Sequence, residues 1–182
     1  VCEQPSQPAF PVMQLIEGSS LRNLMDTIEG QRMPCDQMRS YFKQMLLGID
    51  HCHSLGVIHR DIKPANLMIT INGVCKLVDF GVAEMLDMFA SHETQVIGTR
   101  TRGSPAFQPP EVASGKGGLG TAIDVWSAGV TLFFAITGDV PFSGKSVEAL
   151  YTAILDAPLV LPPPPTATVA KVPPQNRDAR AS

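Results

Sequence analysis

The chain has 182 residues, of which 44% are hydrophobic, and a formal net charge of −3. This composition is typical of a globular protein with one sizeable core, and it lacks the positive charge that nucleic-acid binding requires. Four cysteines, at positions 2, 35, 52 and 75, have no metal-site spacing and are expected to be reduced thiols. No secretory signal is expected at the start, and the most apolar stretch, residues 125–137, is too short to span a bilayer.

The first elements expected along the chain are a short strand and a long helix. Residues 12–21 read as an apolar strand that runs into a polar turn and a helix. The clearest helix is expected over residues 36–55, where one apolar face recurs at helical spacing: Met38, Tyr41, Phe42, Met45, Leu46 and Ile49. Gly56 is expected to end this helix. His51 and His53 lie two residues apart on it, so they would form a poor metal chelate.

A β-hairpin and a long loop are expected next. Two β-rich runs, residues 67–70 and 74–79, flank Ile71-Asn72-Gly73, and Asn-Gly between apolar runs predicts a hairpin. Residues 81–111 show no sustained periodicity, which is typical of a functional or disordered loop. The Gly-rich residues 115–120 follow no strand and lack a Gly-Lys-Ser/Thr ending, so a connector is favoured over a phosphate cradle.

The C-terminal part is expected to contain two helices and a tail. Residues 125–137 predict a buried core helix, and residues 143–155 predict a helix whose apolar face is formed by Val147, Leu150, Tyr151 and Ile154. From residue 158 the chain becomes proline-rich, which predicts a disordered or polyproline-type tail. A passive tail, a reading-frame artefact and an SH3-type ligand all remain open for it.

Four motifs carry the chemistry of the chain. The first two are His59-Arg60-Asp61-Ile62-Lys63-Pro64-Ala65-Asn66 and, after the hairpin, Asp79-Phe80-Gly81. The others are Gly103-Ser104-Pro105-Ala106-Phe107-Gln108-Pro109-Pro110-Glu111 and Asp124-Val125-Trp126-Ser127-Ala128-Gly129-Val130. In this order they resemble the catalytic, metal-binding and substrate-docking loops and the long buried helix of eukaryotic protein kinases. The resemblance covers roughly residues 12–155 and implies an α+β kinase-like fold, mainly the helical C-terminal lobe with its short hairpin.

The resemblance implies a serine/threonine kinase that transfers the γ-phosphate of ATP to protein substrates, with Mg²⁺ as cofactor. Asp61 would orient the substrate hydroxyl and accept its proton, and Lys63 would offset charge on the γ-phosphate. Asn66 and Asp79 would be the Mg²⁺ ligands, since this hard cation prefers oxygen. Lys63 and Ser104 follow the serine/threonine pattern rather than the tyrosine pattern.

The same resemblance implies positions for the nucleotide and for structural support. Met13 would lie at the back of the adenine pocket, Ile16 would offer backbone groups to the adenine edge, and Met68 would lie under the ring. Lys63, Asn66 and Asp79 would contact the phosphates and metal at the other end of the nucleotide. Asp124 would hold the backbone of the catalytic loop.

Residues 81–111 would be the activation segment of such a kinase. Its hydroxyls open to modification are Ser91, Thr94, Thr99 and Thr101. Arg60 would meet a phosphate there. Among subfamilies the chain resembles liver kinase B most, then the calcium/calmodulin-dependent kinase kinases. This implies a cytoplasmic or nuclear signalling protein that has protein substrates and an activating partner protein.

The expected organisation is an N-terminal remnant (1–11), a partial kinase domain (12–157) and a proline-rich tail (158–182). Residues 1–11 contain no Gly-x-Gly-x-x-Gly loop or strand lysine, and no buried arginine is evident to pair with Glu111. The chain, which begins at Val1, is therefore expected to be a fragment that is inactive alone. The alternative function is that of a catalytically inactive kinase-like fragment that acts only through binding, or a partial gene product.

Overall fold

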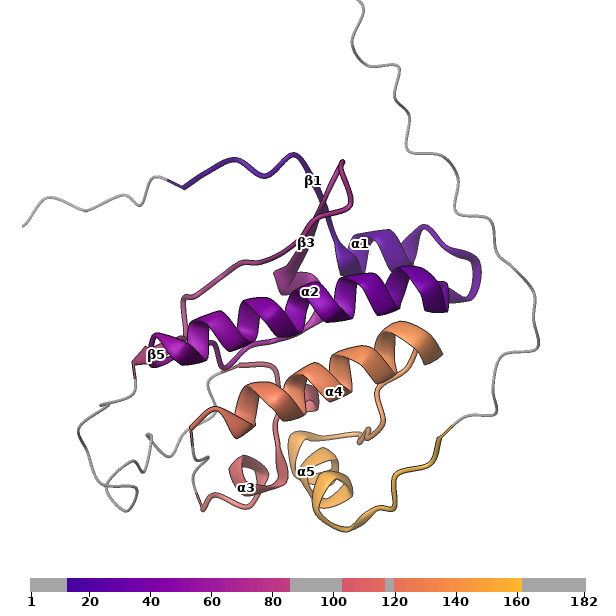
Figure 1. Ribbon diagram of the computed structural model, residues 1–182. Coiled ribbons are helices and arrows are strands. Elements are labelled where there is room, and N and C mark those ends of the chain that lie inside the picture. Colours follow the sequence, from indigo (N-terminus) through magenta and orange to yellow (C-terminus); the bar gives the residue numbers. More distant parts are fainter. Residues whose placement is uncertain (1–12, 86–102, 117–119, 162–182) are drawn as a thin grey trace, which may run out of the picture.

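The computed structural model describes residues 13–85, 103–116 and 120–161. In chain order the elements are β1 (Gly18–Ser20), α1 (Leu21–Asp26), η1 (Glu29–Gln31), α2 (Cys35–Ser54), β2 (Val57–Ile58), η2 (Pro64–Asn66), β3 (Leu67–Thr70), β4 (Cys75–Leu77), β5 (Glu84–Met85), η3 (Pro105–Phe107), α3 (Pro110–Ala113), α4 (Ala122–Thr137) and α5 (Val147–Asp156). The described part therefore combines helices with small sheets, so the α+β class expected from the sequence is confirmed (Figure 1).

Both sheets are small and antiparallel. The larger has the strand order β1-β3-β4, and the smaller pairs β2 with β5. The hairpin between β3 and β4 is confirmed, because the Gly73 N–H donates to the Thr70 carbonyl at 2.9 Å and Gly73 has a positive φ of 76°. The second strand is shorter than expected, residues 75–77 instead of 74–79. Asn66 stands just before the first strand of this hairpin and Asp79 just after the second.

Helix α2 forms where the apolar spacing predicts it, shifted by one residue. Met38, Met45 and Ile49 are buried on its inner face, as expected for residues three and four positions apart. Leu46, assigned to the same face, is 40% exposed, so that assignment was wrong. The helix ends as expected at Gly56, whose φ of 72° suits glycine and whose N–H donates to the His53 carbonyl at 3.0 Å.

Helix α4 spans 16 residues and buries one side rather than its whole surface. Ile123, Ala128 and Phe134 belong to the buried side, whereas Val125 is 60% exposed. Gly138 ends the helix with a φ of 85°. None of the helices in the described ranges has both the length and the apolarity needed to cross a membrane.

Two further expected boundaries were wrong. The strand expected from residue 12 begins only at Gly18, because β1 pairs with β3 from that residue onward; Met13 and Leu15 are 81% and 85% exposed. Helix α5 begins at Val147, not at residue 143, because the Ser146 side chain caps it by accepting the N–H of Ala149 at 3.2 Å.

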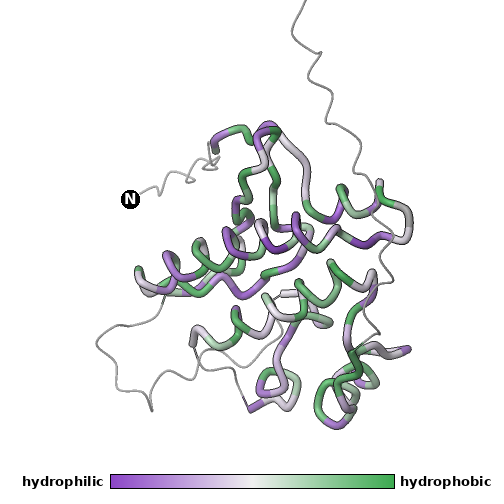
Figure 2. Tube along the Cα trace, turned by 45° about the vertical axis from the view of Figure 1, so that its right-hand side comes forward, coloured by the Kyte–Doolittle hydropathy of each residue, from purple (hydrophilic) through white to green (hydrophobic). Residues whose placement is uncertain are grey.

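The core lies between α2, α4, α1 and the three-stranded sheet. Figure 1 shows α2 running between the hairpin and α4, with α3 and α5 on the far side of α4. The hydropathy colouring in Figure 2 alternates along α2 but is largely hydrophobic along α4. Buried apolar residues from these elements and from the loops between them form one cluster: Leu21, Met25, Met33, Met38, Met45, Ile49, Ile62, Leu67, Ile69, Ala128, Phe134 and Ala135. The loop between β2 and β3 therefore rests on a packed base.

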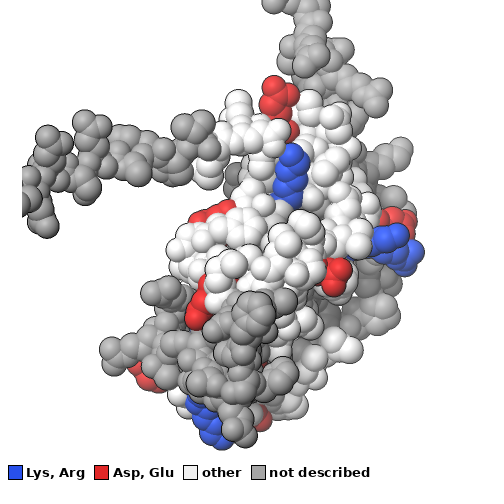
Figure 3. Space-filling view, turned by 60° about the vertical axis from the view of Figure 1, so that its left-hand side comes forward, with Lys and Arg blue, Asp and Glu red and all other residues white. Residues whose placement is uncertain are grey.

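The surface charge of the described part is sparse and mixed in sign. On the face shown in Figure 3, Lys and Arg side chains stand singly among Asp and Glu, and most of the described surface carries neither. This distribution agrees with the small net charge of −3. On that face the described residues therefore present no continuous basic patch of the kind that binds nucleic acid.

Candidate active site

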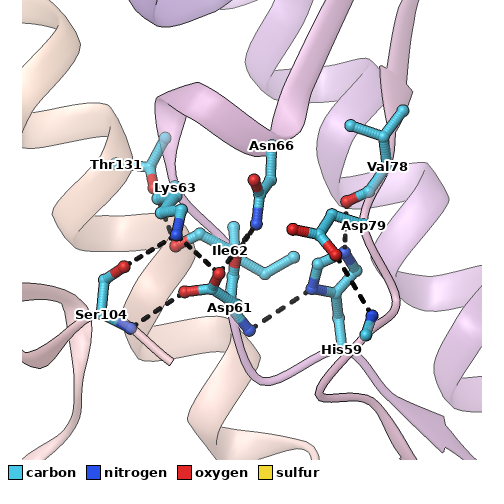
Figure 4. Close-up of polar contacts among 10 residues, drawn as sticks. His59, Asp61, Ile62, Lys63, Asn66, Val78, Asp79, Ser104 and Thr131 are labelled. Atoms are coloured by element: carbon cyan, nitrogen blue, oxygen red, sulfur yellow. Dashed lines mark hydrogen bonds and ion pairs between the residues drawn. The ribbon is translucent and has the colours of Figure 1, made fainter. Parts of the chain in front are cut away.

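Asp61 lies at the centre of a polar cluster on the loop between β2 and β3 (Figure 4). One carboxylate oxygen accepts the Lys63 ammonium at 2.6 Å and the Asn66 side-chain amide at 2.9 Å, and the other accepts the backbone N–H of Ser104 at 2.9 Å. The Lys63 ammonium also donates to the Ser104 hydroxyl at 2.8 Å. The structure thus brings Asp61, Lys63 and Asn66 together, as the sequence predicted, and adds Ser104.

The surroundings of Asp61 keep its carboxyl ionised. Burial by itself raises the pKa, but the hydrogen bonds from Lys63 and Ser104 and the positive charge of Lys63 outweigh it. The pKa of Asp61 therefore lies below its usual value. An ionised carboxylate fixed by several donors is suited to accept one more hydrogen bond, from a hydroxyl brought to it.

Asp124, from the first turn of α4, holds the backbone of this loop. Its side chain is fully buried, and its two oxygens accept the N–H groups of His59 and Arg60, each at 2.8 Å. The His53 ring of α2 bonds the same carboxylate at 2.8 Å. The supporting role expected of Asp124 is therefore confirmed. Arg60 has a φ of 67°, a conformation that residues other than glycine seldom adopt, and these bonds keep the loop in it.

Asn66 and Asp79 are two oxygen-bearing side chains at the edge of the cluster. Their backbones are joined next to this point by a hydrogen bond from the Val78 N–H to the Asn66 carbonyl at 3.1 Å. Asn66 uses its amide nitrogen for Asp61, which leaves its oxygen as a ligand, and Asp79 is exposed and spends one oxygen on the Gly81 N–H at 3.3 Å. This donor set suits Mg²⁺. No cluster of three or more His, Cys, Asp or Glu residues suited to a metal occurs in the described ranges.

Of the three residues expected around the adenine, Ile16 lines a cavity of the described part and the other two do not. A cavity of about 400 Å³ lies between residues 14–17 and the tip of the hairpin, and Ile16 lines it. Met13 and Met68 do not line this cavity; Met13 is exposed, and Met68 is half-buried in β3 opposite Lys76. The nucleotide contacts of Met13, Ile16 and Met68 stay predictions.

Arg60 binds a carboxylate rather than standing free. Its guanidinium donates to the Glu84 side chain, and the two form an ion pair. The hydroxyls of Ser91, Thr94, Thr99 and Thr101 lie outside the described residues. Glu111 stands in the short helix α3, and no basic side chain of the described part pairs with it.

Sequence reasoning missed three polar partners. His53 was considered only as a metal ligand, Ser104 only as a marker of substrate class, and Glu84 was not assigned a role. The signal in the sequence for Ser104 was the adjacent glycine. Gly103 has a φ of 97°, and a Cβ there would lie 2.5 Å from the Arg60 carbonyl oxygen. This close approach brings the Ser104 N–H to Asp61.

Comparison with known proteins agrees with this geometry. The family described as "Protein kinase domain" matches residues 1–177. The chain belongs to the protein kinase family. It is 44% identical over 136 residues to serine/threonine-protein kinase STK11 of Rattus norvegicus, a match that covers 74% of this chain and 30% of the relative.

Two further relatives of this kinase chain are a protein kinase kinase and a serine/threonine-protein kinase. It is 43% identical over 142 residues to the calcium/calmodulin-dependent protein kinase kinase cmkC of Emericella nidulans, covering 74% of the chain and 26% of the relative. It is 38% identical over 159 residues to CBL-interacting serine/threonine-protein kinase 16 of Arabidopsis thaliana, covering 85% and 33%. STK11 is liver kinase B, and cmkC is a calcium/calmodulin-dependent kinase kinase. The two subfamily resemblances expected from the sequence are thus confirmed. The chain spans about a third of the length of the curated relatives it matches.

Proposed function

We propose that the chain is the catalytic-loop part of a serine/threonine protein kinase, which transfers the γ-phosphate of ATP to hydroxyls of protein substrates. The observation that carries the proposal is the Asp61 cluster: an ionised carboxylate held by Lys63, Asn66 and Ser104. Phosphoryl transfer depends on positioning and charge neutralisation more than on covalent chemistry. A rigid carboxylate beside an ammonium group provides both.

Asp61 would orient the substrate hydroxyl and take its proton. The lowered pKa keeps this carboxyl ionised, so it can accept the hydrogen bond of the substrate hydroxyl and orient it. The Lys63 ammonium donates to both Asp61 and Ser104, so its positive charge lies beside the carboxylate. The γ-phosphate would have to come close to that carboxylate to reach the substrate hydroxyl. It would neutralise that charge during transfer.

Asn66 and Asp79 would hold Mg²⁺ through their side-chain oxygens. The ion, when bound, neutralises phosphate charge and fixes the orientation of the phosphates. Asn66 also ties this site to Asp61 through its amide nitrogen at 2.9 Å, so a residue that would hold the metal also positions the carboxylate. Met13, Ile16 and Met68 would contact the adenine.

In finer terms, we infer that residues 12–157 form the hinge and the helical C-terminal lobe of the domain. Support comes from the place of the Asp61 loop between β2 and β3 and from the α4 helix that holds it. The name of one relative, a protein kinase kinase, supports protein substrates. We further propose an activating partner protein and a cytoplasmic or nuclear site of action.

The test is transfer of labelled phosphate from Mg·ATP to a generic protein substrate. Both residues 1–182 and the full-length product of the same gene are assayed. In the full-length protein Asp61→Asn should lower kcat by about 10²-fold or more and leave ATP affinity nearly unchanged, because Asp61 acts on the hydroxyl. Asp79→Ala should instead weaken Mg²⁺-dependent nucleotide binding.

Asp139→Asn is the matched control, since this exposed aspartate uses only its backbone in the described contacts. Turnover by the full-length protein that equals its own Asp61→Asn variant would refute the proposal and favour the binding-only alternative. The same loss in both variants, with unchanged Mg²⁺ dependence, would refute the separate roles of Asp61 and Asp79.

A further inference from the structure

The side chain of Arg60 is enclosed and paired within its own fold. Only 6% of it is exposed, and its guanidinium donates to the carboxylate of Glu84, which is 31% exposed. Arg60 immediately precedes Asp61, and its N–H is one of the two that Asp124 holds. A displacement of this side chain would therefore also displace the backbone of Asp61, the residue that would bind the substrate hydroxyl.

The fold places Glu84 there through β-pairing. Strand β5 pairs antiparallel with β2, and this register sets Glu84 opposite Ile58, two residues before Arg60. The turn that leads into β5 is closed by a hydrogen bond from the Ala83 N–H to the Phe80 carbonyl at 3.1 Å. The pairing therefore sets Glu84 within reach of Arg60 by backbone contacts alone.

The charge at this position requires a partner. A guanidinium stays protonated in proteins, and a buried charge without a counter-ion is strongly unfavourable. Glu84 satisfies that requirement from within the described fold. A phosphate group that approached Arg60 would have to displace this carboxylate and would be repelled by it at close range.

We propose that Glu84 is a positioning residue, the permanent counter-ion of Arg60, which keeps the Arg60-Asp61 backbone in its active geometry without any phosphorylation. The inference rests on the proposed kinase function for its catalytic consequence, but the ion pair itself can be tested by folding alone. It departs from the expectation that Arg60 serves as the receptor for a phosphate on the loop that follows.

The first experiment is a double-mutant cycle on residues 1–182, in which the stability of each variant is measured by urea unfolding. Glu84→Gln should lower the folding equilibrium constant by about 10-fold or more, because it leaves the guanidinium unpaired. In an Arg60→Gln background the same change should lower the folding equilibrium constant by less than about 3-fold. Asp50→Asn, an exposed carboxylate on α2 with no ion pair in the described part, is the control. Equal losses in both backgrounds would overturn the pairing.

If Glu84→Gln does not fold, the double variant decides. A folded Arg60→Gln/Glu84→Gln protein supports the pairing, and an unfolded one overturns it. Glu84→Asp keeps the charge and should recover part of the loss.

The second experiment uses the full-length protein and a protein phosphatase. Wild-type kcat should be unchanged after dephosphorylation, whereas Glu84→Gln should lower kcat by about 10-fold or more with little change in the KM for Mg·ATP. Loss of wild-type activity on dephosphorylation, with recovery on rephosphorylation, would overturn the inference. Absence of turnover in the wild type would instead refute the proposed function, and the unfolding cycle would still decide the pairing.

Discussion

Replacing Asp124 by asparagine should destabilise the fold strongly, although the change alters one atom. The native carboxylate accepts three hydrogen bonds at 2.8 Å, from the N–H groups of His59 and Arg60 and from the His53 ring. Asparagine keeps one acceptor oxygen and turns an N–H₂ group toward donors. An unsatisfied buried donor costs about 1–3 kcal/mol, so the loss should be about 2–4 kcal/mol. Alanine leaves both backbone N–H groups without a partner and should cost about 3–6 kcal/mol.

The measurement is urea unfolding of residues 1–182, monitored by far-UV circular dichroism. For a slope of about 2 kcal/mol/M, the expected loss for Asp124→Asn lowers the midpoint by about 1–2 M. Asp139→Asn makes the same chemical change on an exposed residue and should shift the midpoint by less than about 0.3 M. His53→Ala removes one of the three donors and should fall between these values.

The reasoning fails if Asp124→Asn unfolds at the same urea concentration as the Asp139→Asn control. That result would mean that the loop reaches its geometry without the carboxylate of α4. The left-handed backbone of Arg60, which has a φ of 67°, would then have to be held by contacts other than those with Asp124.

Two further predictions concern a thiol and a glycine. Iodoacetamide at pH 8 should alkylate exposed Cys35 and spare Cys75. Burial raises the pKa of Cys75 to about 11, so only about 0.1% of this thiol is ionised at pH 8. Peptide mass spectrometry that finds rapid labelling of Cys75 would contradict this. Gly103→Ala should destabilise the fold by about 1–3 kcal/mol more than Gly115→Ala in the same urea assay, and equal effects would be the contrary result. Both glycines have positive φ, but a Cβ added at Gly103 would lie 2.5 Å from the Arg60 carbonyl oxygen, whereas a Cβ added at Gly115 would meet no atom within 4 Å.

Local patterns predicted the elements that depend on local physics. The helical spacing of Met38, Met45 and Ile49 located α2 to within one residue, and Asn72-Gly73 located the hairpin. Both signals are contained within a few consecutive residues, where side-chain period and turn chemistry determine the backbone.

Boundaries and long-range polar pairs were harder to predict. Residues 12–17 are apolar enough for a strand, but a strand needs a partner, and β3 pairs only from Gly18 onward. Ser146 and Ser143 are equally good cap residues in the sequence, and the structure uses Ser146. The pair of Arg60 with Glu84 depends on the register between β2 and β5, which no single-residue preference encodes.

The bond between His59 and Asp124 joins residues 65 positions apart, and this separation affects how the protein is made. On the ribosome the Asp61 loop emerges long before α4, which is needed to hold it. At about 5–20 residues per second, the delay is roughly 3–13 seconds, during which His59 and Arg60 have only water as a partner for their N–H groups. The site should therefore become ordered late in synthesis, and the nascent chain should depend on chaperones most in that interval.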